Sequence, residues 1–400
     1  MPVEPGIVRR HPKNKKVFAA IEGVRALGAL SVATSHGWNN PIRDLPWFNG
    51  SFLVVEMFFV LSGYLLTRVL SPRLQRPADA AAEIVRRLGR LYPLHLTVLL
   101  AWLVIFYGKQ LAAQTLMAVG VGPAFTPIDQ QVSFDTGYFL LNLVMLHGVG
   151  IQDSDLFNFP AWSISVDFWS FVVVAAVFTV VRHTRTRRAV LLAMMLLCLL
   201  HYLAVWMHGG NPAAHSKPLI ENSLSRGLLA YLYGVLAAEL QTGITWRPSA
   251  AIVHVVQAML ALAIPFTVAN QSALPLSQAW VPALWACLIV SLAGNRGWLA
   301  GLLSWRPLGW IGRRSYAIYI SHALLLLVAR HPMMKVSDPR LTLLGWVAYI
   351  AAAILLADVL HRRIEKQAFE PFKRLAARVR AAPPPASPAA ARPMPHLPGI

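Results

Sequence analysis

Long apolar runs separated by short polar segments dominate this chain. Ten of these runs approach the ~20 apolar residues that a helix needs to cross a membrane. They lie at residues 18–38, 50–70, 91–108, 161–181, 189–207, 224–241, 249–269, 279–294, 314–330 and 341–361. The apolar stretch 138–147 is too short to cross, so we expect an interfacial or re-entrant segment on the outer side. The pattern predicts an all-α, polytopic integral membrane helix bundle of about ten transmembrane helices.

Composition and charge agree with this class. The mean hydropathy is +0.53, and 13% of the residues are charged, about half the fraction of a soluble domain. With the N-terminus inside, 28 of the 36 Lys and Arg residues fall in inner segments and six in outer ones. Cytoplasmic loops carry such an excess. We therefore expect both termini in the cytoplasm, and the net charge of +19 needs no nucleic-acid partner.

The two ends of the chain differ in composition from the middle. Residues 1–17 form a basic arm, residues 18–366 the membrane domain, and residues 367–400 a tail that is Pro/Ala-rich toward its end and expected to be disordered. The basic arm before an apolar run resembles a signal peptide. Glu22 and Arg25 interrupt that run and no A-x-A site follows it, so we expect the first span to be retained.

Two ionisable residues, Arg25 and His36, lie inside the first apolar run. On a helix they share one face about 16 Å apart. Ionisable side chains within a span are costly and usually face a polar interior. The spacing therefore indicates a polar route through the bundle. The alternative is an arginine that snorkels and a histidine at the outer end of the helix.

Polar residues also interrupt the second and fourth spans. Glu56, Ser62 and Gly63 indicate a polar lining with close helix approach, or a packing seam of small residues. Asp167 follows a Pro-containing helix start on the predicted outer side. Its carboxylate could orient a histidine from another span, or lie in head-group water.

The ninth span and the cytoplasmic loop before the third span carry further candidates. Ser315, Tyr319 and His322 form one polar stripe, with the histidine near mid-membrane, where a purely structural role is the alternative. Arg87 and Arg90 are i, i+3 neighbours at the predicted inner mouth. Two guanidinium groups on one side suit a polyphosphate, although ordinary positive-inside flanking explains them too.

Other common chemistries lack their motifs. No His, Cys, Asp or Glu set has metal-ligand spacing, so we expect no metal. No phosphate-binding loop and no GxSxG nucleophile elbow occur, which argues against ATP-driven transport and hydrolase chemistry. His95 and His147 have no partner that the sequence identifies, and Cys198 and Cys287 fall in predicted spans as apolar fillers.

Taken in order, the polar motifs resemble membrane acyltransferase family 3, which includes the O-acetylases of bacterial surface polysaccharides. The resemblance covers residues 18–366. The motifs are Arg25-x10-His36, Glu56-x-Phe-Phe-x-x-Ser-Gly-Tyr64, Arg87-x-x-Arg90-x-x-Pro93, Trp162-Ser-x-Ser-x-Asp167, Ser315-Tyr-x-Ile-Tyr-x-x-His322 and Ile364-Glu365. Asp167 stands where the family usually has Glu, and this leaves the role of Asp167 open. Glu56 stands where Asp is more usual, and the Pro that commonly follows the motif ending in Glu365 is missing.

The resemblance implies transfer of an acyl group, usually acetyl, from acyl-CoA to a hydroxyl of a carbohydrate or glycolipid. His36 would be the catalytic histidine, as a general base or through an acyl-histidine. Arg25 would hold the thioester and, with Tyr319, stabilise the oxyanion. Arg87 and Arg90 would bind CoA phosphates at the inner face, and we place Ser62 in this donor site.

The same resemblance implies a multi-pass protein of a bacterial inner membrane, surrounded by lipid. The acceptor stays open among lipopolysaccharide, exopolysaccharide and smaller glycosides, and the oligomeric state is open too. No hydrolase-like domain follows in this sequence, so we expect another protein to perform any second step.

The main alternative is a proton-coupled secondary transporter, because ten spans with internal ionisable residues also suit a carrier. The absence of an obvious internal repeat argues against it. A purely structural protein ranks third, because so many intramembrane polar groups would be costly without a use. Acyl-CoA-dependent labelling of a glycan separates the first two, since a carrier leaves its substrate unmodified.

Overall fold

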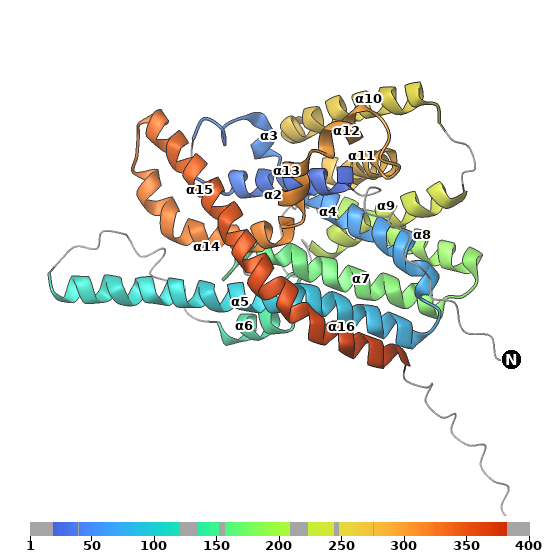
Figure 1. Ribbon diagram of the computed structural model, residues 1–400, viewed down its shortest axis with the longest axis horizontal. Coiled ribbons are helices and arrows are strands. Elements are labelled where there is room, and N and C mark those ends of the chain that lie inside the picture. The colour runs from blue at the N-terminus through green and yellow to red at the C-terminus, as the bar shows by residue number, and fades with distance from the viewer. Residues whose placement is uncertain are drawn as a thin grey trace, which may run out of the picture.

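The computed structural model describes residues 19–38, 40–120, 135–151, 157–208, 223–243, 248–274 and 276–381, and within these ranges it is helical without strands (Figure 1). The α-helices are α2 (Ala19–Ser35), α3 (Pro46–Asn49), α4 (Phe52–Leu65), α5 (Pro77–Ala118), α6 (Thr136–Leu143), α7 (Trp162–Val180), α8 (Thr184–Met207), α9 (Ser223–Gly243), α10 (Ala250–Ala269), α11 (Ser277–Leu292), α12 (Trp298–Leu303), α13 (Arg306–Gly312), α14 (Ser315–Met334), α15 (Pro339–Leu360) and α16 (Lys366–Ala381). Short 3₁₀ or π segments are η1 (Leu66–Leu70), η2 (Ser71–Arg73), η3 (Phe159–Ala161), η4 (Gln271–Ala273) and η5 (His361–Glu365).

A helix lies at each of the ten expected spans, namely α2, α4, α5, α7, α8, α9, α10, α11, α14 and α15. Six continuous helical stretches in the described chain are long and apolar enough to cross a membrane. The all-α membrane class is therefore confirmed, while the count of ten and the cytoplasmic termini stay predictions. The short stretch expected not to cross contains α6, which has only eight residues.

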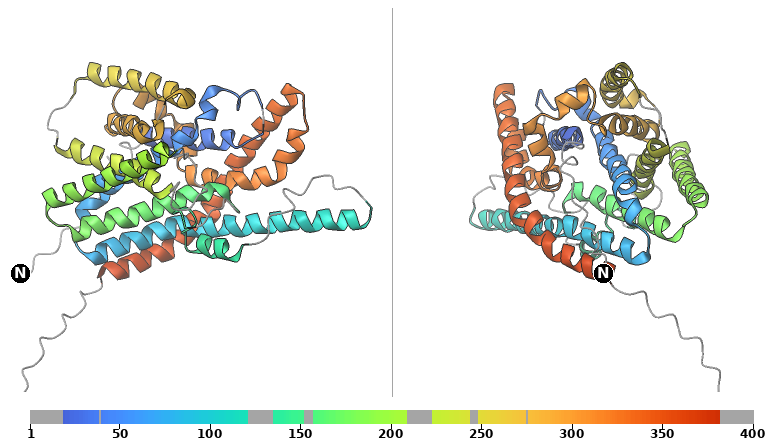
Figure 2. Two further views of the ribbon diagram at one scale, coloured as in Figure 1. Left: turned by 180° about the vertical axis from the view of Figure 1, so that it is seen from behind. Right: turned by 45° about the vertical axis from the view of Figure 1, so that its right-hand side comes forward.

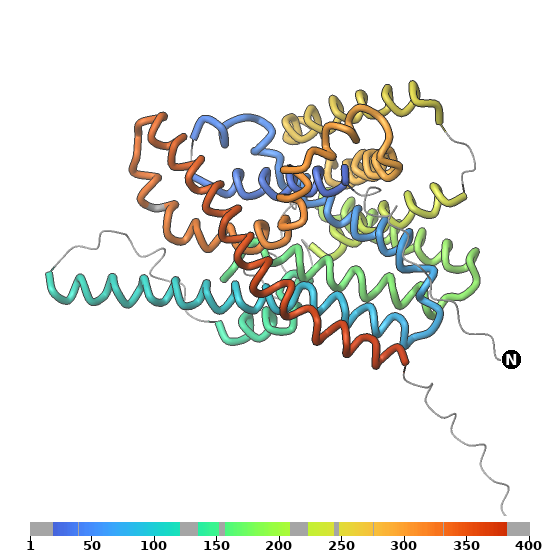
Figure 3. The backbone as a smooth tube through the Cα atoms, in the orientation of Figure 1, coloured from blue at the N-terminus to red at the C-terminus, as the bar shows by residue number. Residues whose placement is uncertain are grey.

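Helix α5 is much longer than the span predicted within it. Pro77 occupies its first turn, and the Asp79 carboxylate caps that turn by accepting the backbone N–H of Arg76 at 2.9 Å. The helix has 42 residues, about 63 Å at the α-helical rise. Its C-terminal end projects beyond the other helices (Figure 3). We predicted Arg87 and Arg90 in a loop before residue 91; this was wrong, because the helix begins ten residues before Arg87.

The C-terminal helix corrects a second prediction. We expected residues 367–400 to be disordered, but α16 continues to Ala381 and runs along the N-terminal half of α5 (Figures 1 and 2). Phe372 packs directly against Gly89 of α5, where an added Cβ would come within 2.1 Å of the phenylalanine side chain. Arg380 pairs with Glu83 at 2.7 Å. Residues 1–18 and 382–400, which include the basic arm and the rest of the predicted tail, lie outside the described residues.

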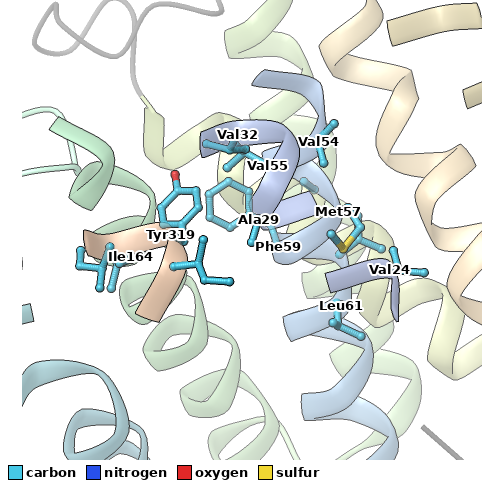
Figure 4. Packing of buried hydrophobic residues seen from close by; sticks show 14 of the residues in the cluster. Val24, Ala29, Val32, Val54, Val55, Met57, Phe59, Leu61, Ile164 and Tyr319 are labelled. Atoms are coloured by element: carbon cyan, nitrogen blue, oxygen red, sulfur yellow. The ribbon is translucent and has the colours of Figure 1, made fainter. Parts of the chain in front are cut away.

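The main core joins α2, α4, α7 and α14 around the polar groups discussed below. Figure 4 shows side chains of these four helices together, among them Val32, Met57, Ile164 and Tyr319. Helices α4 and α9 approach closely at Gly63. A Cβ added there would lie 2.0 Å from the Tyr231 carbonyl oxygen, so only glycine fits. Such small-residue contacts are typical of membrane helix packing.

Candidate active site

Two predicted catalytic histidines meet in the core. His36 Nδ1 lies 3.0 Å from His322 Nε2, and the two rings are parallel within 4° at a centroid distance of 5.2 Å. His36 is half-buried just after the end of α2, whereas His322 of α14 is fully buried. The sequence predicted both residues, but their contact joins positions 286 residues apart.

The hydrogen-bond partners assign the tautomers of this pair. His322 Nδ1 lies 2.8 Å from the carbonyl oxygen of Tyr319. A carbonyl only accepts, so this nitrogen carries the proton and a neutral His322 has its lone pair on Nε2. His36 Nδ1 then donates to that lone pair. In a neutral His36, the basic atom is consequently Nε2, the nitrogen away from His322.

Aromatic residues shield the histidine pair. Phe159 of η3 packs edge-on against His36, with ring centroids 4.9 Å apart, and it also contacts the His322 ring. The Tyr319 hydroxyl lies 2.8 Å from Ser163 Oγ, inside the buried core. We did not select Ser163 or Phe159 as site residues from the sequence: the serine is part of the Trp162-Ser-x-Ser-x-Asp167 motif, and the phenylalanine lies just before the predicted span. Together they hold the pair in mostly apolar surroundings.

A second polar group joins Arg87, Asp167 and Ser62. Arg87 Nη2 donates to Asp167 Oδ2 and to Ser62 Oγ, the latter at 3.1 Å. The guanidinium also lies over the Phe171 ring, 4.6 Å from its centroid. Asp167 therefore contacts an arginine instead of the histidine that we considered, because the longer α5 places Arg87 beside it.

Arg90 follows Arg87 by three residues on α5 and takes no part in the Arg87–Asp167 ion pair. Its side chain is exposed, and within the described part of the chain it makes no hydrogen bond or ion pair. Its charged neighbours are Arg25, Glu365, Arg87 and Glu22. Arg25 pairs with Glu22 at 3.0 Å. Arg25 and Arg87 thus both lie within electrostatic range of Arg90, and joint phosphate binding by Arg87 and Arg90 stays a prediction.

Glu56 forms a buried ion pair with Arg226. The Arg226 guanidinium also donates to the Phe52 carbonyl oxygen at 3.1 Å and lies 5.3 Å from the centroid of the Trp162 ring. Both charged side chains are almost completely inaccessible. This pair joins α4 to α9, so the Glu56 carboxylate that we expected in a polar lining is paired inside the bundle.

Comparison with known proteins agrees with this arrangement of motifs. A model of the acyltransferase domain matches residues 18–362. The chain is 26% identical over 387 residues to YrhL of Bacillus subtilis, and 23% identical over 376 residues to the peptidoglycan O-acetyltransferase OatA of Listeria monocytogenes. These matches cover 90% and 88% of this chain. An O-acetyltransferase OatA of Staphylococcus aureus matches with 23% identity over 377 residues, 89% of this chain and 58% of that protein.

The chain spans 57% and 56% of the length of the YrhL and Listeria proteins that it matches. No solved structure matches it. The family match covers nearly all of the predicted membrane domain, and it favours the acyltransferase interpretation over the transporter. On this match and on the motifs that it contains, the chain belongs to the membrane acyltransferase family.

Proposed function

We propose that this protein is an O-acyltransferase of a bacterial inner membrane that moves an acyl group, first of all acetyl, from acyl-CoA to a hydroxyl of a cell-surface carbohydrate or glycoconjugate. The observation that carries the proposal is the His36–His322 hydrogen bond, which presents one basic nitrogen in a shielded core. The relatives named as peptidoglycan O-acetyltransferases make a cell-wall glycan the first acceptor to test.

The reaction would need one base that later acts as an acid. His36 Nε2 removes the proton of the acceptor hydroxyl while the oxygen attacks the thioester carbonyl carbon. The new C–O bond forms, the C–S bond breaks, and His36 returns the proton to the leaving thiolate. Transient acylation of His36 Nε2 is the two-step alternative. In both routes the Tyr319 hydroxyl is a candidate donor to the oxyanion.

His322 would orient His36 and stabilise its protonated form. It accepts the Nδ1–H of His36 and donates its own Nδ1–H to the Tyr319 carbonyl. This chain fixes the ring orientation and stabilises the imidazolium that forms when His36 takes up a proton, as an orienting partner does in other base-catalysed acyl transfers. Phe159 packs edge-on against the His36 ring, and an apolar ring there would limit the access of water, which competes with the acceptor hydroxyl.

The donor phosphates would bind at Arg90 and Arg25. Arg90 is an exposed cation without a hydrogen-bonded counterion among the described residues, and guanidinium groups bind phosphate oxygens in a bidentate manner. Arg87 is engaged with Asp167 and Ser62. We therefore assign the phosphates to Arg90 and Arg25, and the interior of the donor site to Arg87 and Ser62.

The test uses membranes with matched amounts of wild type, His36→Ala or His254→Ala, supplied with radiolabelled acetyl-CoA. His254 is an exposed histidine on α10 and serves as the control. Label in the glycan fraction with wild type and His254→Ala, and its loss with His36→Ala, would support the proposal. Equal label in all three would remove His36 from the reaction. If the membranes moved a glycan substrate across without modifying it, and no label appeared in the glycan fraction, the transporter would be favoured.

A further inference from the structure

Around the Arg87–Asp167 pair lie buried polar atoms without a hydrogen-bond partner in the described part of the chain. Asp167 Oδ1, Arg87 Nε and the Tyr231 hydroxyl are buried and have no hydrogen-bond partner among the described residues. Tyr231 of α9 is within electrostatic range of both charged groups. Buried polar atoms are nearly always satisfied, so three together indicate a missing partner.

One side of this cluster can be reached from outside. The Arg87 and Asp167 side chains keep 20% and 19% of their surface accessible, whereas Tyr231 is fully buried. Four helices supply the cluster: α4 through Ser62, α5 through Arg87, α7 through Asp167 and α9 through Tyr231. A bound group would therefore lie between helices, in contact with the pair and with the tyrosine.

The available atoms restrict the chemistry of that group. Asp167 Oδ1 accepts, Arg87 Nε donates, and the Tyr231 hydroxyl does both. An anion would be repelled by Asp167 and a cation by Arg87. A neutral group that offers one donor and one acceptor fits, and an amide provides its N–H for the carboxylate and its C=O for the arginine or tyrosine.

We infer that Tyr231, Arg87 and Asp167 bind an amide of the pantetheine arm of acyl-CoA. The inference rests on the proposed function, since only a CoA thioester donor brings this arm. The arm connects the phosphates, which we assign to Arg90 one turn along α5, with the thioester. An N-acetylated sugar of the acceptor is the other source of an amide. Tyr231 is thereby a donor-specificity residue that the motifs did not contain.

The test measures binding to the purified full chain in lipid nanodiscs, with pantetheine as probe and N-acetylglucosamine as the second ligand. Wild type is compared with Tyr231→Phe, which deletes one hydroxyl, and with Tyr233→Phe, a half-buried tyrosine on the same helix. We expect Tyr231→Phe to weaken pantetheine binding by about 2- to 10-fold, as the loss of one hydrogen bond predicts. Tyr233→Phe should bind as wild type does.

Equal pantetheine affinity in wild type and Tyr231→Phe would overturn the inference. Binding of N-acetylglucosamine but not pantetheine, weakened by Tyr231→Phe, would overturn the donor assignment and give the amide site to the acceptor. Thermal unfolding midpoints of the unliganded variants show whether each protein is folded. The binding measurement needs no turnover. A failure of the acetyl-transfer experiment would therefore contradict the proposed function without changing the measured pantetheine affinities.

Discussion

Two histidine pairs lie in this bundle with almost the same ring geometry. His36 and His322 are parallel within 4° at 5.2 Å, and His95 and His147 are parallel within 4° at 5.3 Å. The first pair shares a hydrogen bond of 3.0 Å. In the second pair no hydrogen bond joins the rings within the described residues; His95 Nε2 bonds the Asn142 carbonyl oxygen instead, and its Nδ1 has no partner.

The two pairs also differ in access. His36 is half-buried, whereas His95 and His147 are 1% and 6% exposed. Burial lowers the pKa of His147 to about 3, with the nearby His95 adding to the effect, so this ring stays neutral. A buried histidine is thus not by itself a catalytic candidate. The accessible ring with a directed chain of hydrogen bonds is the one suited to move a proton.

The largest difference between the pairs should appear in the transfer rate. His36→Ala should lower acetyl transfer by about 10²- to 10⁴-fold, the usual contribution of a general base. His95→Phe and His147→Phe should leave the rate per folded molecule nearly unchanged, because neither residue takes part. Initial rates in membranes, normalised to folded protein, measure this. A comparable loss of acetyl-transfer rate with His147→Phe would show that the catalytic role is not confined to the His36–His322 pair.

The role of His322 can be separated from simple packing. His322→Phe removes the acceptor for His36 Nδ1–H and should reduce the rate by about 10²-fold. His322→Gln keeps a side-chain oxygen that can accept this proton, so it should recover part of the loss. The measurement is the rate of each variant as a function of acceptor concentration. Equal rates for the two variants would contradict the acceptor role.

The second pair should be visible in the pH dependence of stability. The pKa of His147 lies below its ordinary value of 6.5 in the folded protein, so the unfolded chain binds a proton first as the pH falls. Its stabilising contribution is complete above pH 6.5 and declines toward pH 3. From pH 6.5 to 5, wild type should lose about 2 kcal/mol more than His147→Phe.

Unfolding of both proteins at several pH values in one detergent tests this sign. Parallel pH curves for wild type and His147→Phe would show that His147 is not the group responsible.

The smallest effect concerns the aromatic contact of the first pair. Phe159→Leu removes an edge-on ring worth about 0.5–1.5 kcal/mol, which corresponds to about 2- to 10-fold in rate if it orients His36. Tyr138→Leu is the matched change at His147, where the ring centroids are 6.4 Å apart. It should not alter the rate. Equal rates for wild type and Phe159→Leu would restrict Phe159 to packing.

Hydropathy predicted where helices lie, because each span needs a long apolar run. It could not predict where α5 begins, since residues 77–90 contain five charged residues and no long apolar run, yet are helical. For the same reason Arg87 and Asp167 were placed on opposite sides of the membrane, although they form an ion pair.

The candidate site was predicted as residue types and not as contacts. His36 and His322 stood out because ionisable groups are rare in spans, but one sequence contains no information on which spans adjoin. Tyr231 gave only a weak signal, because a tyrosine in an apolar helix is ordinary. His95 and His147 had no identifiable partner for the same reason, and the fold makes them partners of each other.

Pro93 divides α5 into two mechanical parts. A proline inside a helix lacks the N–H that would bond the carbonyl four residues earlier, here that of Gly89, so the rod is most easily flexed there. The N-terminal part is fastened to α16 and carries Arg87 and Arg90, while the C-terminal part carries His95. Flexure at Pro93 would therefore change the distance between Arg90 and the basic nitrogen of His36, and it would strain the Arg87 contacts with Asp167 and Ser62.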